Sequence, residues 1–172
     1  MLTQEQLKNE LTYNSITGVF TRAKSNTNSI IKGEISGSLS PDGYLKIMVL
    51  AKRYQSHRLA WLYEKGEFPK NHVDHINGIK GDNRICNLRD ATSEENNKNS
   101  SFSKANKSGY TGVIWHKSSS NWVARIGHKN KKIHLGCFDD INDAVKARRD
   151  AEAKYGFHKN HGKKPAKLEG DL

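Results

Sequence analysis

The sequence has little of what would place it in several large classes of protein. Its two cysteines, Cys86 and Cys137, lie far apart and form no CxxC pair, which excludes a disulfide framework and a Cys-rich zinc knuckle. No apolar run approaches the ~18 residues that span a bilayer. The opening residues MLTQEQLKNE lack the charged-then-apolar order of a signal peptide. We therefore expect a cytoplasmic protein with reduced cysteines and no membrane partner.

Acidic residues are in the minority as well. The 172 residues include 29 Lys and Arg against 18 Asp and Glu, so the formal net charge is +11. Residues 1–99 carry 14 basic and 11 acidic side chains, whereas residues 100–172 carry 15 and 7. A basic excess of this size favours a polyanionic partner, and the C-terminal part holds most of the excess.

Hydrophobic periodicity and turn residues predict a mixed α+β chain. Helices are expected over residues 3–11, 56–66 and 140–156, and strands over 15–23, 43–50, 110–116, 121–128 and 131–138. The candidates for the helix N-caps are Thr3, Ser56 and either Asp139 or Asp140, and Gly66 and Gly156 are placed to end the second and third helices.

One stretch, residues 73–99, carries the residue types of a catalytic site. The sequence VDHINGIKGDNRICNLRDATSEENNKN combines an Asp-His pair, an Asn-Gly turn, an Asn-rich loop and a capping box that opens a helix. Asp74 and Asn96 offer the hard oxygen donors that Mg²⁺ prefers. His75 has an ordinary pKa of about 6.5, which suits a general base, and Asn87 is expected to hold its ring through a hydrogen bond. Because adjacent strand residues point to opposite faces, Asp74 and His75 share a site only if the strand ends or bulges there.

Four motifs in this order resemble the HNH endonucleases, in particular the phage-encoded homing type. They are HRLAW at 57–61, VDH at 73–75, DNRICNLR at 82–89 and Asn96. The resemblance covers roughly residues 40–100. It implies a ββα-metal fold that cleaves DNA phosphodiesters with one divalent ion, Mg²⁺ or alternatively Mn²⁺. It places the general base on His75, the metal ligands on Asp74 and Asn96, and the middle, structure-setting Asn on Asn87. Many members have His where this chain has Asn96.

A second resemblance covers about residues 108–161. The elements Y-x-G-V, N-W-V-A-x-I, L-G-x-F, an Ala-rich helix and Asn160 are similar to the AP2 DNA-binding domain of plant transcription factors and phage homing enzymes. The resemblance implies a three-stranded sheet laid in the DNA major groove, with a helix packed behind it.

Alternation along these strands sorts their side chains into two faces. The helix side is expected to hold Val113, Trp115, Trp122, Ala124, Ile126, Ile133, Leu135 and Cys137. The opposite, DNA-facing side is expected to hold Ile114, His116, Val123, Arg125, Lys132 and His134. Arg125 is the best candidate for a base contact, because a guanidinium pairs bidentately with guanine. Lys132, His116 and His134 are expected to contact bases or phosphates.

Several of these residues also have a purely structural interpretation. His57 can cap or pack at a helix start, and Arg84 and Arg89 either clamp DNA phosphate or are simply solvated. Both cysteines are expected as small buried side chains. Trp115 and Trp122 are expected in the core rather than stacked on bases.

The resulting hypothesis is a site-specific, metal-dependent DNA endonuclease of the homing HNH type. It acts as a monomer on double-stranded DNA, in the host cytoplasm if phage-encoded, with no small-molecule substrate. The expected parts are N-terminal antiparallel strands with the nuclease domain (1–96), a basic polar linker (97–107), the AP2-like domain (108–161) and a flexible basic tail (162–172). Two alternatives stay open: an inactive DNA-binding regulator, and a structural zinc site, for which the usual thiolate spacing is missing.

Overall fold

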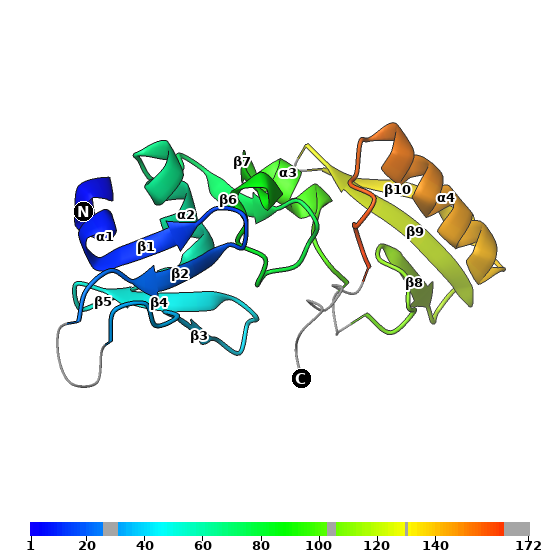
Figure 1. Cartoon of the computed structure of the whole chain (residues 1–172). Coiled ribbons are helices and arrows are strands. Elements are labelled where there is room, and N and C mark those ends of the chain that lie inside the picture. Colours follow the sequence, from blue (N-terminus) through cyan, green and yellow to red (C-terminus); the bar gives the residue numbers. More distant parts are fainter. Residues whose placement is uncertain (26–30, 103–105, 130, 164–172) are drawn as a thin grey trace. The chain divides into compact units, whose positions relative to one another are not determined.

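The computed structural model describes residues 1–25, 31–102, 106–129 and 131–163. Contacts between residues divide the chain into two units, one built from Met1–Thr92 and the other from Ser93–Pro165 (Figure 1). The described residues form four α-helices and several small antiparallel sheets, so the predicted α+β class is confirmed. None of these helices is both long and apolar enough to span a membrane.

The predicted domain limits stay predictions. The unit boundary before Ser93 lies close to the expected end of the nuclease domain at residue 96. This boundary assigns the helix that begins at Ser93 to the second unit. Residues 164–172, which make up most of the predicted basic tail, lie outside the described residues.

The first unit consists of short strands and two α-helices, and it contains Asp74, His75 and Asn87 of the candidate site. Its elements are α1 (Gln4–Glu10), β1 (Leu11–Asn14), β2 (Val19–Arg22), β3 (Ser38–Leu39), β4 (Leu45–Val49), β5 (Lys52–Gln55), α2 (Ser56–Lys65), β6 (His72–His75), the 3₁₀ turn η1 (Ile85–Asn87) and β7 (Leu88–Ala91). They form a β1-β2 pair, a three-stranded sheet in the order β3-β4-β5, and a β6-β7 pair. The strands predicted near β2 and β4 are found in shorter form, and β1, β5 and β7 were not predicted.

Two of the three signals predicted for the helix ends of this unit are confirmed. The Thr3 side chain accepts a hydrogen bond from the Gln6 N–H, and the Gln6 side chain completes a capping box at the start of α1. Gly66 ends α2 with a φ of 84°, a conformation that favours glycine. The predicted cap Ser56 is instead the first residue of α2, whose N-cap is Gln55.

The hydrophobic core of the first unit lies between the two helices and the strands. Its most deeply buried side chains are Leu7, Leu11, Phe20, Ile47, Val49, Leu59 and Leu62. Leu59 and Leu62 come from one face of α2, which packs against β4, β5, β6 and η1. This packing brings the start of α2 next to the end of β6.

The second unit consists of a short helix, a three-stranded antiparallel sheet and a long helix. Its elements are α3 (Ser93–Lys98), β8 (Val113–His116), β9 (Asn121–His128), β10 (Lys131–Phe138) and α4 (Ile141–Lys154), with the sheet in the order β10-β9-β8. β9 and β10 have the predicted bounds. Asp140 caps α4 by accepting a hydrogen bond from the Asn142 N–H, as predicted. Val113 and Ala124 of the sheet pack with Ala144 and Val145 of α4 in the core.

The face alternation predicted for β10 fails beyond His134. Pairing with β9 shifts between His134 and Gly136, whose φ is 144°, so an extra residue bulges out of the strand. Beyond the bulge Cys137 is paired with Val123, so it lies on the face away from α4 and is exposed. Its Sγ is 3.7 Å from Nε2 of His134. The predicted burial of Cys137 is therefore wrong.

Two further expectations about burial need correction. Cys86, predicted as a small buried side chain, is exposed. The Trp115 side chain packs edge-on against Trp122 with ring centroids 5.1 Å apart, yet 46% of its surface is exposed. The predicted core position of Trp115 is therefore wrong, whereas Trp122 is partly buried and packs against the core as predicted.

Candidate active site

The Asp-His pair lies at the end of a two-stranded ladder. β6 pairs with β7 as far as His75, and Asp74 lies directly opposite Arg89. The chain then turns, and the Gly78 N–H donates a hydrogen bond to the His75 carbonyl at 2.9 Å. The strand therefore ends at His75, which is the condition that strand geometry sets for Asp74 and His75 to serve one site.

Asp74 is a buried carboxylate with a guanidinium beside it. Only 7% of its surface is exposed, and its Oδ2 accepts hydrogen bonds from Arg89 Nε at 3.0 Å and Nη2 at 2.8 Å. Two charge-assisted hydrogen bonds of this kind fix the orientation of the carboxylate. Arg89 was predicted to contact DNA or to be solvated. Its partner in this structure is Asp74, and its contact with DNA stays a prediction.

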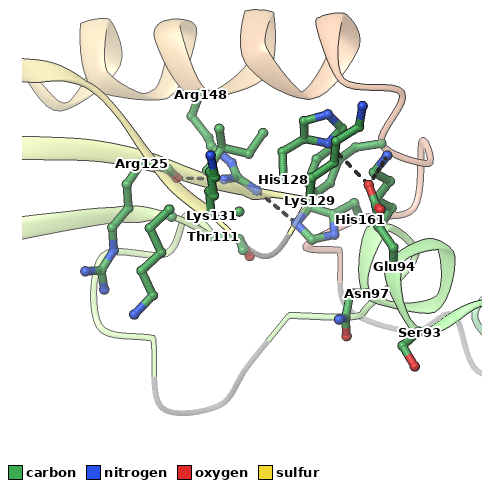
Figure 2. Close-up of a pocket in the computed structure, with 16 residues that line it drawn as sticks. Ser93, Glu94, Asn97, Thr111, Arg125, His128, Lys129, Lys131, Arg148 and His161 are labelled. Atoms are coloured by element: carbon green, nitrogen blue, oxygen red, sulfur yellow. Dashed lines mark hydrogen bonds and ion pairs between the residues drawn. The ribbon is translucent and has the colours of Figure 1, made fainter.

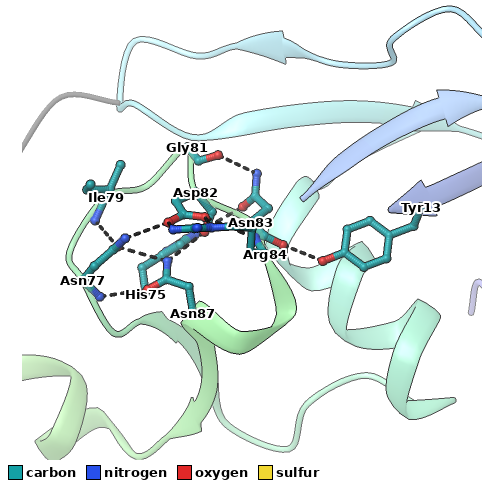
Figure 3. A network of polar contacts seen from close by, with 9 residues as sticks. All are labelled: Tyr13, His75, Asn77, Ile79, Gly81, Asp82, Asn83, Arg84 and Asn87. Atoms are coloured by element: carbon teal, nitrogen blue, oxygen red, sulfur yellow. Dashed lines mark hydrogen bonds and ion pairs between the residues drawn. The ribbon is translucent and has the colours of Figure 1, made fainter. Parts of the chain in front are cut away.

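His75 is held by an asparagine, although not by the predicted one. The ring is 4% exposed, and its Nε2 lies 3.2 Å from Oδ1 of Asn83 (Figure 3). The predicted hydrogen bond from Asn87 is therefore wrong. Because an amide oxygen accepts, Nε2 carries the proton and Nδ1 is the unprotonated, basic nitrogen. Burial lowers the pKa of His75, while the hydrogen bond with Asn83 opposes part of this shift, so the ring is neutral near pH 7.

Asn87 braces the loop that joins β6 to β7. Its Oδ1 accepts a hydrogen bond from the Asn77 N–H at 3.0 Å, and its Nδ2 donates to Asn77 Oδ1 at 3.0 Å and to the Asp82 carbonyl at 2.8 Å (Figure 3). All of these partners belong to the loop. This arrangement fits the structure-setting role that the HNH resemblance implied for Asn87.

A second buried carboxylate stabilises the same loop. Asp82 is almost fully buried, and it accepts hydrogen bonds from Arg84 Nε at 2.7 Å and Nη2 at 2.6 Å and from Asn77 Nδ2 at 2.7 Å. The hydrogen bonds from Arg84 are the largest cause of a lowered pKa for the Asp82 carboxyl. The Arg84 side chain nevertheless remains about half exposed. Its predicted contact with DNA stays a prediction.

Asn83 connects the loop to a strand far away in the sequence. Its side chain is 1% exposed, its Nδ2 donates to the Gly81 carbonyl at 3.2 Å, and its own carbonyl accepts from the Tyr13 hydroxyl at 2.7 Å (Figure 3). Burial is the largest cause of the raised pKa of Tyr13, so this hydroxyl keeps its proton and donates. Sequence reasoning missed both residues. No local signal separates Asn83 from the other loop asparagines, and Tyr13 is 70 residues away.

His57 packs against His75 from the start of α2. The two ring centroids are 5.0 Å apart with the rings nearly perpendicular, and the Tyr44 ring lies 5.2 Å from His57. Only 4% of His57 is exposed, and burial, followed by the charges of His75 and Arg58, lowers its pKa to about 3. His57 is therefore a neutral side chain that packs against His75, which agrees with its interpretation as a residue that packs at a helix start.

The sequence of this region matches known proteins. A family model described as HNH endonuclease matches residues 54–98. Protein 3.8 of Escherichia phage T7 is 32% identical over 82 residues, which cover 47% of this chain and 68% of that protein. The chain belongs to the HNH endonuclease family. No solved structure matches the chain.

The HNH endonuclease match also covers the helix that carries the second predicted metal ligand. HNH nucleases generally use a divalent metal ion. Asp74 belongs to the first unit and Asn96 lies on α3 of the second, and their convergence around one ion stays a prediction. Among the described residues, no group of three or more His, Cys, Asp and Glu could hold a metal ion. The predicted ligands, the Asp74 carboxylate and the Asn96 carboxamide, are only two hard oxygen donors and so fall short of such a group.

The predicted DNA-facing side of the sheet is open in this HNH endonuclease. Arg125 lies between the buried residues Ala124 and Ile126 on β9 and points away from α4, opposite His134 of β10. All four predicted contact residues of this face are exposed: His116, Arg125, Lys132 and His134. Their contacts with DNA stay predictions.

Proposed function

We propose that the chain is a homing-type, divalent-metal-dependent endonuclease that hydrolyses DNA phosphodiester bonds at a preferred site. The observation that carries this proposal is the setting of His75 within the HNH match. The imidazole is buried and neutral, follows Asp74 in the chain, and has one nitrogen held by an amide oxygen. A general base must be unprotonated and held in orientation before substrate binds.

In the proposed reaction His75 takes a proton from the attacking water. The amide of Asn83 fixes Nε2 as the protonated nitrogen, so Nδ1 receives the proton. General base catalysis by a positioned histidine contributes about 10² to 10⁴ in rate. The loop that Asn87 and Asp82 brace keeps Asn83, and through it the imidazole, in one orientation.

Asp74 and Asn96 are the residues proposed to hold the metal ion. A carboxylate and a carboxamide oxygen are donors that Mg²⁺ and Mn²⁺ accept, with water and phosphate completing the shell. When bound, the ion would neutralise charge that develops on the phosphate and the leaving oxygen. Arg89 holds the Asp74 carboxylate in orientation through two hydrogen bonds to Oδ2.

The second unit is proposed to read DNA in the manner of an AP2 domain. Its sheet presents Arg125, Lys132, His116 and His134 on the face away from α4. The excess of basic residues after residue 100 would supply salt-dependent affinity for the phosphate backbone. We propose that the protein acts as a monomer on double-stranded DNA in the host cytoplasm.

A plasmid assay tests the proposed function. Supercoiled plasmid carrying the native locus is incubated with wild type, His75→Ala or His72→Ala, in Mg²⁺, in Mn²⁺ and in EDTA. We expect metal-dependent nicking or linearisation by wild type and His72→Ala, because His72 is an exposed residue on the same strand, and a loss of about 10² or more with His75→Ala. No cleavage by wild type in any metal would favour the inactive DNA-binding regulator. Unchanged cleavage by His75→Ala would show that another group is the base.

A further inference from the structure

The second unit contains a basic cavity that the proposed sheet face does not include. It has a volume of about 460 Å³ and lies between α3 and the β9-β10 hairpin (Figure 2). The cations that line it are Lys98, Arg125, Lys129, Lys131, Lys132 and Arg148, whereas Glu94 is its one carboxylate. Such a concave, cationic surface attracts anions much more strongly than an open one.

One cation that lines the cavity, Arg148, is held in place by an ion pair with Glu152 and by further hydrogen bonds. Arg148 is only 5% exposed, and its guanidinium donates to the Arg125 carbonyl at 2.7 Å and to Glu152 at 2.8 Å. Its Nη2 lies 3.1 Å from Nε2 of His161, as the dashed lines in Figure 2 show. Burial is the largest cause of a lowered pKa for His161, so the imidazole is neutral and accepts this hydrogen bond. Hydrogen bonds therefore hold Arg148 and His161 in place before any anion binds.

Glu94 neutralises only part of the charge at the rim. Its Oε1 lies 3.1 Å from Lys98 Nζ and 3.3 Å from His128 Nδ1. Lys129, Lys131 and Lys132 are exposed, and the part of the chain that the structure describes offers them no ion pair. These three lysines are thus available for an anion that enters the cavity.

The chemistry of the lining favours phosphate over a nucleobase. Phe157 is the aromatic ring of the cavity, and two cations already lie over it, Arg148 at 5.3 Å and Lys98 at 5.9 Å from its centroid. A base would need an uncovered aromatic face for stacking. Lysine ammonium groups act instead as point charges that suit phosphate oxygens.

We propose that this cavity binds phosphates of the DNA backbone. The proposal rests on DNA being the substrate, as the proposed function has it. DNA is favoured over a free anion because Arg125 and Lys132 belong both to the cavity and to the sheet face proposed to read DNA. A strand lying along that face would continue into the cavity, where Lys129 and Lys131 neutralise two further phosphates.

The test measures DNA affinity in EDTA, where no cleavage occurs, so its outcome does not depend on nuclease activity. Fluorescence anisotropy with a duplex of about 30 base pairs gives Kd at several salt concentrations for the full chain and for Lys129→Ala/Lys131→Ala. Because each neutralised phosphate contributes about 0.9 to the slope of log K against log salt, we expect a slope shallower by about 2. Affinity should fall on the order of tenfold at physiological salt.

Matched variants separate the cavity from general charge. Lys146→Ala/Lys154→Ala removes two exposed lysines of α4 that do not line the cavity, and its slope should stay close to that of wild type. Lys129→Arg/Lys131→Arg keeps the charge and should restore the slope. A wild-type slope for Lys129→Ala/Lys131→Ala, or an equal loss in the α4 variant, would overturn the proposal. Binding of pyrophosphate or ATP that depends on Lys129 and Lys131 and is not displaced by duplex would also overturn it, in favour of a small anion.

Discussion

Oδ1 of Asn83 lies 3.2 Å from Nε2 of His75, and this contact fixes which nitrogen of the imidazole can act as a base. The same asparagine accepts a hydrogen bond from the Tyr13 hydroxyl through its backbone carbonyl at 2.7 Å. The orientation of the proposed general base therefore depends on β1, far from the HNH motifs in the sequence.

Asn83→Ala is expected to slow cleavage without weakening DNA binding. Removing one hydrogen bond of about 0.5–1.5 kcal/mol makes the orientation of the ring less fixed, so single-turnover rates should fall by roughly tenfold. Asn83→Asp keeps an acceptor but adds a negative charge, which would raise the pKa of His75 and shift the acidic limb of the pH-rate profile to higher pH. A folded Asn83→Ala protein with wild-type rates would show that the contact has no role in catalysis.

Gly18→Ala is expected to disturb the loop that carries Asn83. Gly18 has a φ of 75°, and an added Cβ would lie 2.5 Å from the Arg84 nitrogen and 2.6 Å from the Asn83 carbonyl carbon. Left-handed backbone costs an alanine about 1 kcal/mol, and the clash with main chain should bring the loss to about 3 kcal/mol.

Gly33→Ala is the matched control for this substitution. Gly33 has a φ of 90°, and among the described residues no atom lies within 4 Å of an added Cβ, so the backbone cost of about 1 kcal/mol is the expected loss. Urea unfolding gives both free energies, and single-turnover assays show whether Gly18→Ala also slows cleavage. Equal losses of stability in the two variants would contradict the close contact with the loop.

Stability is expected to fall as the solution becomes mildly acidic. Burial lowers the pKa of His57 to about 3, whereas its ordinary value is 6.5. Between these values the unfolded chain binds a proton that the folded chain does not, so stability rises with pH across this window and is lost as pH falls. The expected loss from His57 between pH 7 and pH 5 is about 2 kcal/mol. Urea titrations of wild type and His57→Gln test this, since the variant should show a flatter dependence on pH.

Arg89→Ala is expected to change the response of the protein to metal ions. The substitution removes the guanidinium that lies against the mostly buried Asp74 carboxylate, and stability in EDTA should fall by about 1–3 kcal/mol. Without this competing cation the carboxylate should bind a metal ion more tightly, so Mn²⁺ should raise Tm more in Arg89→Ala than in wild type. Equal shifts in Tm for the two proteins would count against Asp74 as a metal ligand.

Local rules in the sequence were enough for several features of this protein. The capping residues Thr3 and Asp140 were found from side-chain chemistry, and the bounds of β9 and β10 from alternation between turns. The order of the HNH motifs was also visible, and the family match over residues 54–98 agrees with it. These features depend on residues close together in the chain, where hydrogen bonding and periodicity follow simple patterns.

Only the tertiary structure decided which partners these residues have. The choice of Asn83 over Asn87 as the partner of His75 depends on the path of a loop held by Tyr13, a residue that no local pattern connects to it. The exposure of Cys137 follows from a bulge that shifts the strand by one residue, and such a shift reverses every face beyond it. The sequence alone does not distinguish one loop asparagine from another, or one register of strand pairing from the next. The free energy of each choice depends on neighbours that only folding brings close.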